Sequence, residues 1–124
     1  MRTELGKVRG LGAAKSGTSR WWMERVTSIA LIPLSIWLLA SLASGVASTH
    51  AVLTDWISNP LVAVLLVLFI AVAFYHAALG LKVVVEDYVH EHGSKVACLL
   101  VIDFLAIAGA LAGIVAVLKI AFGA

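Results

Sequence analysis

Apolar residues fill three long stretches of this chain, and short polar segments separate them. The stretches run roughly over 26–46, 60–85 and 96–122. A helix needs about 20 apolar residues to cross the hydrocarbon core of a bilayer. Inside lipid, a backbone must satisfy its hydrogen bonds within a helix or a closed barrel. The pattern therefore predicts an all-α membrane protein with three transmembrane helices.

Local signals predict where these helices begin, bend and end. The Ser-Asn-Pro run at 58–60 favours a helix start, because proline suits an early helical position. Gly93-Ser94 predicts a break between the second and third stretches. Pro33 lies inside the first stretch and predicts a kink there.

Composition supports the membrane class. Of the 124 residues, 62% are hydrophobic and 13% are charged, whereas soluble domains average about 25% charged residues. The one cysteine, Cys98, excludes a disulfide within the chain, and its apolar surroundings predict a small buried hydrophobe.

The basic residues are concentrated at one end and predict the orientation of the chain. Residues 1–25 form a basic segment, and 26–124 form the three-helix anchor domain. The positive-inside rule then places the N-terminus and the 86–95 connection in the cytoplasm, and the 47–59 loop and the C-terminus in the periplasm. A basic cluster beside an apolar span is more typical of a topology signal than of nucleic-acid binding. The first apolar stretch is longer than the apolar region of a typical signal peptide, which favours a retained helix over a cleaved signal peptide. The basic residues of the segment are Arg2, Lys7, Arg9, Lys15, Arg20 and Arg25.

Aromatic and small residues predict how the helices are anchored and packed. Tryptophan is typical of membrane interfaces. Trp21 and Trp22 are expected at the cytoplasmic interface, and Trp56 and Phe122 at the periplasmic one. Three helices bury little surface among themselves, so we expect helices of partner subunits beside them. Small residues that allow close helix contact support this; they are Ala40, Ala43, Gly45, Ala47, Ala106, Gly109, Ala110 and Gly113.

His76 is the deepest ionisable residue of the second stretch, and its position requires an explanation. An ionisable side chain inside a membrane is a candidate for function. The imidazole either bonds a neighbouring backbone group and is structural, or it ligates a metal such as haem iron. At 100° per residue, Gly80, Val83 and Asp87 share its face. Gly80 leaves room for a flat macrocycle or for another helix. His50, His90 and His92 are expected in loops, so a second imidazole ligand must come from another chain.

Polar residues at the cytoplasmic ends of the spans have two interpretations each. Tyr88 can donate a hydrogen bond to a quinone oxygen, and Asp87 can orient the phenol. Alternatively, Tyr88 is an interfacial anchor and Asp87 belongs to a solvated helix end. Arg25 can bind a carboxylate such as a haem propionate, or it is a topology charge. Thr27 and Ser28 can bond back to their own helix or face a site.

Lys82 and Asp103 are opposite charges on different apolar stretches. Pairing within the bundle lowers the free-energy cost of holding both in the membrane. Alternatively, Lys82 extends its ammonium group to the interface.

The order His76-x-x-x-Gly80 followed by Asp87-Tyr88, after Arg25-Val-Thr-Ser-Ile-Ala in the first span, resembles a known family. This is the family of small haem-anchor membrane subunits of bacterial succinate dehydrogenase, or respiratory complex II. The resemblance covers nearly the whole chain in its layout of helices, although its specific residues are few.

The resemblance implies a set of roles for these residues. His76 is one axial ligand of a haem b shared with a larger second anchor subunit, and Gly80 packs against the haem. Tyr88 and Asp87 bind ubiquinone, and Arg25 lies near the haem propionates or the quinone.

It also implies partners and a location. A flavoprotein with FAD oxidises succinate, and an iron–sulfur protein passes the electrons to the bacterial inner membrane, so this chain carries no succinate chemistry itself. Two alternatives stay open: an anchor of a quinol-linked fumarate reductase, and a non-redox assembly or transporter subunit.

Overall fold

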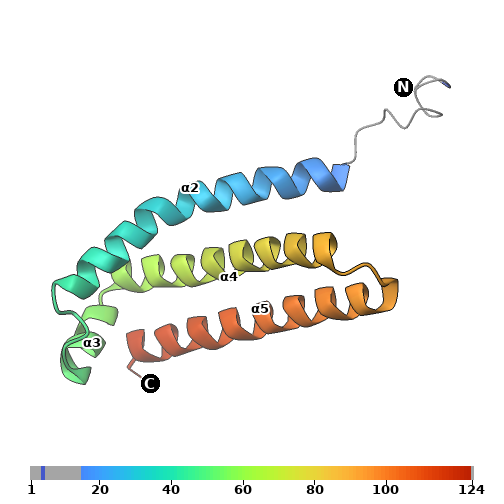
Figure 1. The fold of residues 1–124 in the computed structure, drawn as a ribbon. Helices are drawn as coiled ribbons and strands as arrows, with labels where there is room; N and C mark the ends of the chain where they lie inside the picture. Colours follow the sequence, from blue (N-terminus) through green and yellow to red (C-terminus); the bar gives the residue numbers. More distant parts are fainter. Residues whose placement is uncertain (1–3, 5–14, 124) are drawn as a thin grey trace.

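The described part of the chain is all helical. The computed structural model describes Glu4 and residues 15–123, and Figure 1 shows its fold. Within this part there are no strands, and three helices are long and apolar enough to cross a membrane, as predicted. Arg2, Lys7 and Arg9 lie outside the described residues. The helices are α2 (Lys15–Ala43), α3 (His50–Ile57), α4 (Pro60–Tyr88) and α5 (His92–Ala121).

The start of α4 follows the predicted signal. The side chain of Asn59 accepts a hydrogen bond from the backbone N–H of Leu61 at 2.9 Å, and Pro60 opens the helix. The end of α2 is also local in origin, because Gly45 takes a φ of 95° that side-chain-bearing residues rarely adopt. α2 itself runs through Pro33 without a break.

Two helix boundaries differ from the predicted ones. α2 begins at Lys15 rather than near 26, because its polar first turns contain no proline and a single glycine does not end a helix. α5 begins at His92, so Gly93-Ser94 lies within its first turn and the chain turns at 89–91 instead. The first turn of a helix tolerates small polar residues, since its N–H groups have no partner within the helix.

The predicted loop between the first two spans contains a short helix, α3. Thr49 caps it by accepting a hydrogen bond from the N–H of Val52 at 3.2 Å. His50 is therefore the first residue of a helix rather than a loop residue, as is His92 of α5. On α3, Trp56 stacks on Trp37 of α2 with ring centroids 5.6 Å apart. Trp56 thus contributes to helix packing, beyond the interfacial role predicted for it.

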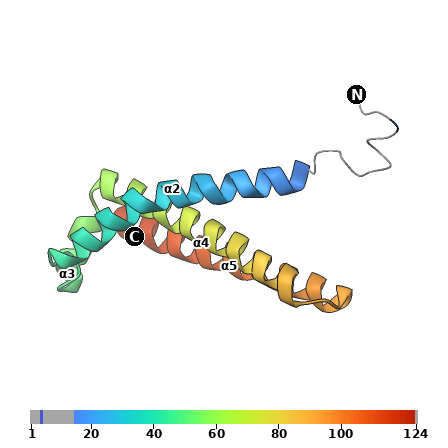
Figure 2. The ribbon, with the colours of Figure 1, turned by 45° about the horizontal axis from the view of Figure 1, so that its top comes forward.

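The long helices lie in a row with α4 in the middle. α4 contacts both α2 and α5, whereas α2 and α5 do not contact each other. Figure 1 shows this order, and the turned view of Figure 2 shows that α4 and α5 stay together while α2 leaves them at an angle. We call the end where α2 begins and α4 meets α5 the proximal end. The other end, with α3 and the C-terminus, is the distal end.

The small core of the described chain lies at the distal end. No large side chain of the described residues is fully buried. The residues that form the main buried cluster are Ile57, Val62, Ala63, Leu66 and Val117, with Trp37 and Trp56 packed against them. A single row of helices can bury little more than this, so the broad faces of α4 stay open toward the proximal end.

Glycines let α5 approach α4 closely. A Cβ at Gly109 would lie 2.5 Å from Cε1 of Phe74, and one at Gly113 would lie 3.2 Å from Cγ2 of Ile70. These two small residues were predicted to allow contact with partner helices. In the structure they are used instead by α4 of the same chain.

Candidate functional site

His76, Gly80 and Asp87 lie along one face of α4, whereas Tyr88 is on another side of this helix and Arg25 lies on α2. His76 is half-buried and Gly80 is exposed, one turn closer to the proximal end. Asp87 and Tyr88 end the helix and are exposed, Tyr88 at 77% of its surface. The helix thus brings together the residues that the spacing placed on one face, and separates His76 from Tyr88 by roughly 18 Å along its axis.

His76 is held by a side chain of the neighbouring helix. Its Nδ1 lies 2.8 Å from Oγ1 of Thr27 on α2. The Thr27 hydroxyl also lies 2.7 Å from the carbonyl oxygen of Met23 and 3.2 Å from that of Glu24. Thr27 is 5% exposed and is the buried polar residue of the described chain. The two predicted alternatives for Thr27 are therefore both realised: it bonds back to its helix and it faces the site.

Ser28 repeats only half of this arrangement. Its hydroxyl donates to the carbonyl of Glu24 at 2.7 Å, within its own helix. It thus serves as an internal comparison for Thr27, because it has the same kind of backbone bond but forms no hydrogen bond with His76.

The surface beside Gly80 is open. No atom of the described residues lies within 4 Å of the position that a Cβ would take there, apart from the adjoining backbone. The sequence left two uses for this glycine, a flat ligand or a second helix. No helix of the described chain takes that space, so whatever covers this face comes from outside it.

The proximal end carries an ion pair that the sequence did not indicate. Arg20 of α2 donates through Nη1 to Oε2 of Glu86 on α4 at 2.5 Å. Each side chain is 35% exposed. Arg20 was counted only among the topology charges, since nothing in the linear pattern connects residues 66 positions apart. The pair ties the start of α2 to the turn of α4 that precedes Asp87 and Tyr88.

Arg25 lies on the exposed side of α2. Its guanidinium carbon is 5.5 Å from the centroid of the Trp21 ring, a cation–π contact within one helix. Trp21 and Trp22 are 54% and 60% exposed, as expected for side chains that face an interface. Because Arg25 is also exposed, its guanidinium stays accessible to an anionic group of a ligand or a partner.

Lys82 and Asp103 pair across α4 and α5, as predicted. Nζ of Lys82 lies 2.6 Å from Oδ1 of Asp103. The pair borders a hollow of about 330 Å³ that Phe74, Tyr75 and Leu79 also line. It connects the two helices on the side of α4 away from α2, and so belongs to the scaffold of the site.

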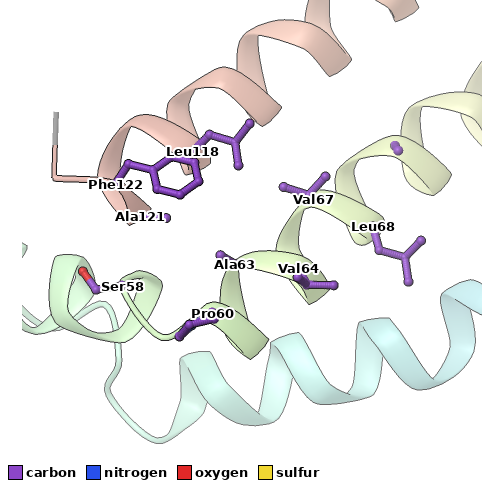
Figure 3. A pocket seen from close by; sticks show the side chains of 10 residues that line it. Ser58, Pro60, Ala63, Val64, Val67, Leu68, Leu118, Ala121 and Phe122 are labelled. Atoms are coloured by element: carbon purple, nitrogen blue, oxygen red, sulfur yellow. The ribbon is translucent and has the colours of Figure 1, made fainter.

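A larger hollow lies toward the distal end. It has a volume of about 530 Å³ and opens between the start of α4 and the end of α5 at the distal end. Figure 3 shows its lining, in which Ser58 is the one polar side chain among apolar residues such as Val64 and Phe122. Val64 is roughly 18 Å from His76 along α4.

The three apolar helices define a multi-pass membrane protein, and the open face of α4 indicates one that works with other components. A family model described as succinate dehydrogenase/fumarate reductase transmembrane subunit matches residues 1–112. The chain belongs to this family and is a membrane-anchor subunit of such a complex, which implies partner subunits. This membership argues against the non-redox alternative.

Curated relatives resemble the chain over nearly its full length. The succinate dehydrogenase hydrophobic membrane anchor subunit of Rickettsia conorii is 30% identical over 93% of this chain and 92% of the relative. That of Rickettsia bellii is 31% identical over 94% and 93%. That of Paracoccus denitrificans is 26% identical over 78% and 75%. No solved structure is significantly similar to the chain.

Proposed function

We propose that this chain is the small hydrophobic anchor subunit of a succinate dehydrogenase in a bacterial inner membrane. In this role it holds one side of a haem b and forms part of the site where ubiquinone is reduced. The relatives support the succinate dehydrogenase assignment, because several carry that name at coverage above 90% of both chains. Electrons come from succinate, which a flavoprotein containing FAD oxidises, and they reach the membrane through an iron–sulfur subunit.

The observation that carries the proposal is the setting of His76. It is a half-buried imidazole within an apolar span, its Nδ1 is engaged by Thr27, and the same helix face is open at Gly80. Haem iron accepts an imidazole ligand, and the macrocycle needs a flat clear surface beside it; these residues would supply both. The donor set therefore fits the group. When bound, haem b takes up and releases one electron at a time.

In this proposal the larger anchor subunit would supply the second ligand of the haem. His50, His90 and His92 of this chain are exposed and lie at the two ends of the helices, away from the level of His76. A haem shared by two subunits also explains why the face around Gly80 is left uncovered by this chain. In this proposal Arg25 binds a propionate or the quinone; its guanidinium is exposed, and a guanidinium can form forked hydrogen bonds to a carboxylate.

Tyr88 and Asp87 act on the quinone. The Tyr88 phenol donates a hydrogen bond to a carbonyl oxygen of ubiquinone, which polarises that carbonyl and favours electron uptake. Asp87 is adjacent and exposed, so its carboxylate exchanges protons with water and orients the phenol. Full reduction of a quinone takes up two electrons and two protons, and a helix end in contact with water suits the proton supply.

A visible difference spectrum tests the haem role directly. The complete assembly is purified through a partner subunit, and reduced-minus-oxidised spectra are recorded for wild type, His76→Ala and His50→Ala. We expect a b-type signal in wild type and in His50→Ala, whose residue is exposed at the distal end, and its loss or marked change in His76→Ala. An intact wild-type assembly without haem, or a wild-type signal in His76→Ala, would refute the proposal.

A further inference from the structure

The buried hydroxyl of Thr27 has three oxygen or nitrogen atoms within hydrogen-bond range and only one proton. These atoms are the carbonyl oxygens of Met23 at 2.7 Å and Glu24 at 3.2 Å, and Nδ1 of His76 at 2.8 Å. A threonine hydroxyl donates once and accepts through two lone pairs, whereas a carbonyl oxygen only accepts. The position of the one proton therefore decides the protonation of the imidazole.

Only one arrangement satisfies both short contacts. If the hydroxyl donated to Nδ1, the 2.7 Å contact between Oγ1 and the Met23 oxygen would hold two acceptors and no proton. If the hydroxyl donates to Met23, its oxygen accepts from an N–H at Nδ1 of His76. Two acceptors 2.7 Å apart with no proton between them repel each other, so the second arrangement is favoured. It puts the proton of a neutral His76 on Nδ1 and leaves Nε2 bare.

We infer that Thr27 is a positioning residue, which selects the Nδ1–H tautomer of His76 and presents Nε2 as the iron ligand. The inference rests on the proposed haem role of His76. A metal binds the unprotonated ring nitrogen, and the other nitrogen usually donates to an oxygen that fixes the tautomer and the ring orientation. Here that oxygen comes from a different helix, so the ligand on α4 is oriented by α2.

The hydrogen bond has a consequence for the electronic properties of the iron. Donation from Nδ1–H pushes electron density toward Nε2 and makes it a stronger donor, which favours oxidised over reduced iron. Loss of the acceptor therefore raises the reduction potential. Loss of such a partner typically weakens metal ligation 10- to 100-fold. A tenfold loss confined to the oxidised state corresponds to an upward shift of about 59 mV for one electron.

A purely structural role for Thr27 predicts a different result. Thr27 also joins α2 to α4, so its replacement can loosen the helices without any change at the iron. The reduction potential and the electron paramagnetic resonance spectrum of the oxidised haem separate the two roles, because both report on the ligand field and neither follows stability alone.

The experiment uses the complete assembly with Thr27→Val, Thr27→Ser and Ser28→Ala. Valine keeps the shape and removes the hydroxyl, serine keeps the hydroxyl, and Ser28→Ala removes a hydroxyl that bonds only its own helix. We expect Thr27→Val to raise the potential and shift the resonance g values, while Thr27→Ser and Ser28→Ala match wild type. Thr27→Cys replaces Thr27→Val if the latter does not assemble, and the weak acceptor sulfur should give a shift in the same direction.

Two kinds of failure remain distinguishable. If the haem of wild type is present and depends on His76, but removal of the Thr27 hydroxyl leaves potential and g values unchanged, the inference about Thr27 is wrong and the haem role stands. If His76→Ala keeps a wild-type haem, the proposed function itself fails.

Discussion

Individual side chains divide α4 into a face used by this chain and a face left open. Leu79 is 8% exposed, whereas the next residue, Gly80, meets no neighbour beyond its own helix. Adjacent positions on a helix point about 100° apart, so a change of one residue exchanges one face for the other. The chemistry proposed for this chain therefore depends on a few positions that can be tested singly.

Gly80→Leu should remove most of the haem from the assembly. A leucine fills the open face, while its helix propensity is better than that of glycine by roughly 1 kcal/mol, so the helix itself does not suffer. Ala71→Leu is the matched control, because Ala71 is exposed roughly 180° around α4 from Gly80. Haem per assembly, measured as its pyridine complex, should fall only in Gly80→Leu. A full haem content in this variant would show that the open face is not where the macrocycle lies.

Tyr88→Phe should reduce ubiquinone reduction roughly tenfold and leave the haem spectrum unchanged. The loss of one hydrogen bond to the substrate corresponds to about 1–1.5 kcal/mol. Succinate oxidation with a soluble dye that takes electrons from the partner subunits serves as the internal reference. Tyr75→Phe, at a half-exposed tyrosine of the same helix, should behave as wild type. Equal rates of quinone reduction in the two variants would show that the Tyr88 hydroxyl does not bind the quinone.

At the scale of elements, α4 and α5 are joined by close contact and by one ion pair. Gly109 and Gly113 let α5 approach Phe74 and Ile70, and Lys82 pairs with Asp103 at 2.6 Å. An unpaired charge in a membrane is costly, so each member of the pair stabilises the other in this place.

Lys82→Met and Asp103→Leu should each lower the thermal stability of the assembly in detergent. The loss of stability in the double variant should be smaller than the sum of the two single losses. A coupling free energy of about 0.5–3 kcal/mol is typical of residues in direct contact. Strict additivity of the two losses would mean that the pair contributes nothing to the association of α4 with α5.

At the scale of the whole molecule, three helices in a row cannot form a closed core. The main buried cluster lies at the distal end, and the proximal end, with the Arg20–Glu86 pair, is more open. The predicted orientation puts the proximal end in the cytoplasm, on the side where the electron-delivering subunits of the proposal would bind. Tyr88 would then lie near the electron donor, and the apolar hollow of Figure 3 near the periplasmic surface.

Labelling of single cysteines tests this orientation. In a Cys98→Ala background, Ser48→Cys lies in the distal connection and His90→Cys in the proximal one; both positions are exposed. A membrane-impermeant maleimide added to intact spheroplasts should label position 48 and spare position 90 until the membrane is opened. The reverse pattern would show that the basic N-terminal segment does not face the cytoplasm.

Much of the architecture follows from local properties of the chain. The three spans follow from runs of apolar residues, and the start of α4 follows from Asn59-Pro60. The common face of His76, Gly80 and Asp87 follows from the helical repeat alone. The pairing of Lys82 with Asp103 was also predictable, because two isolated opposite charges in apolar spans have few other ways to be stabilised. The short helix α3 and the early start of α2 were missed, since polar helical turns carry weak signals.

By itself the sequence determined the class of protein, the number of spans and the residues that share the face of His76, because each depends on hydrophobicity or on a periodicity within one helix. Only the tertiary structure decided that Thr27 meets His76 and that Arg20 meets Glu86. Both contacts depend on the angle and the axial offset at which α2 crosses α4. That offset is set by interlocking side chains on two helices at once, and no local pattern in either helix encodes it.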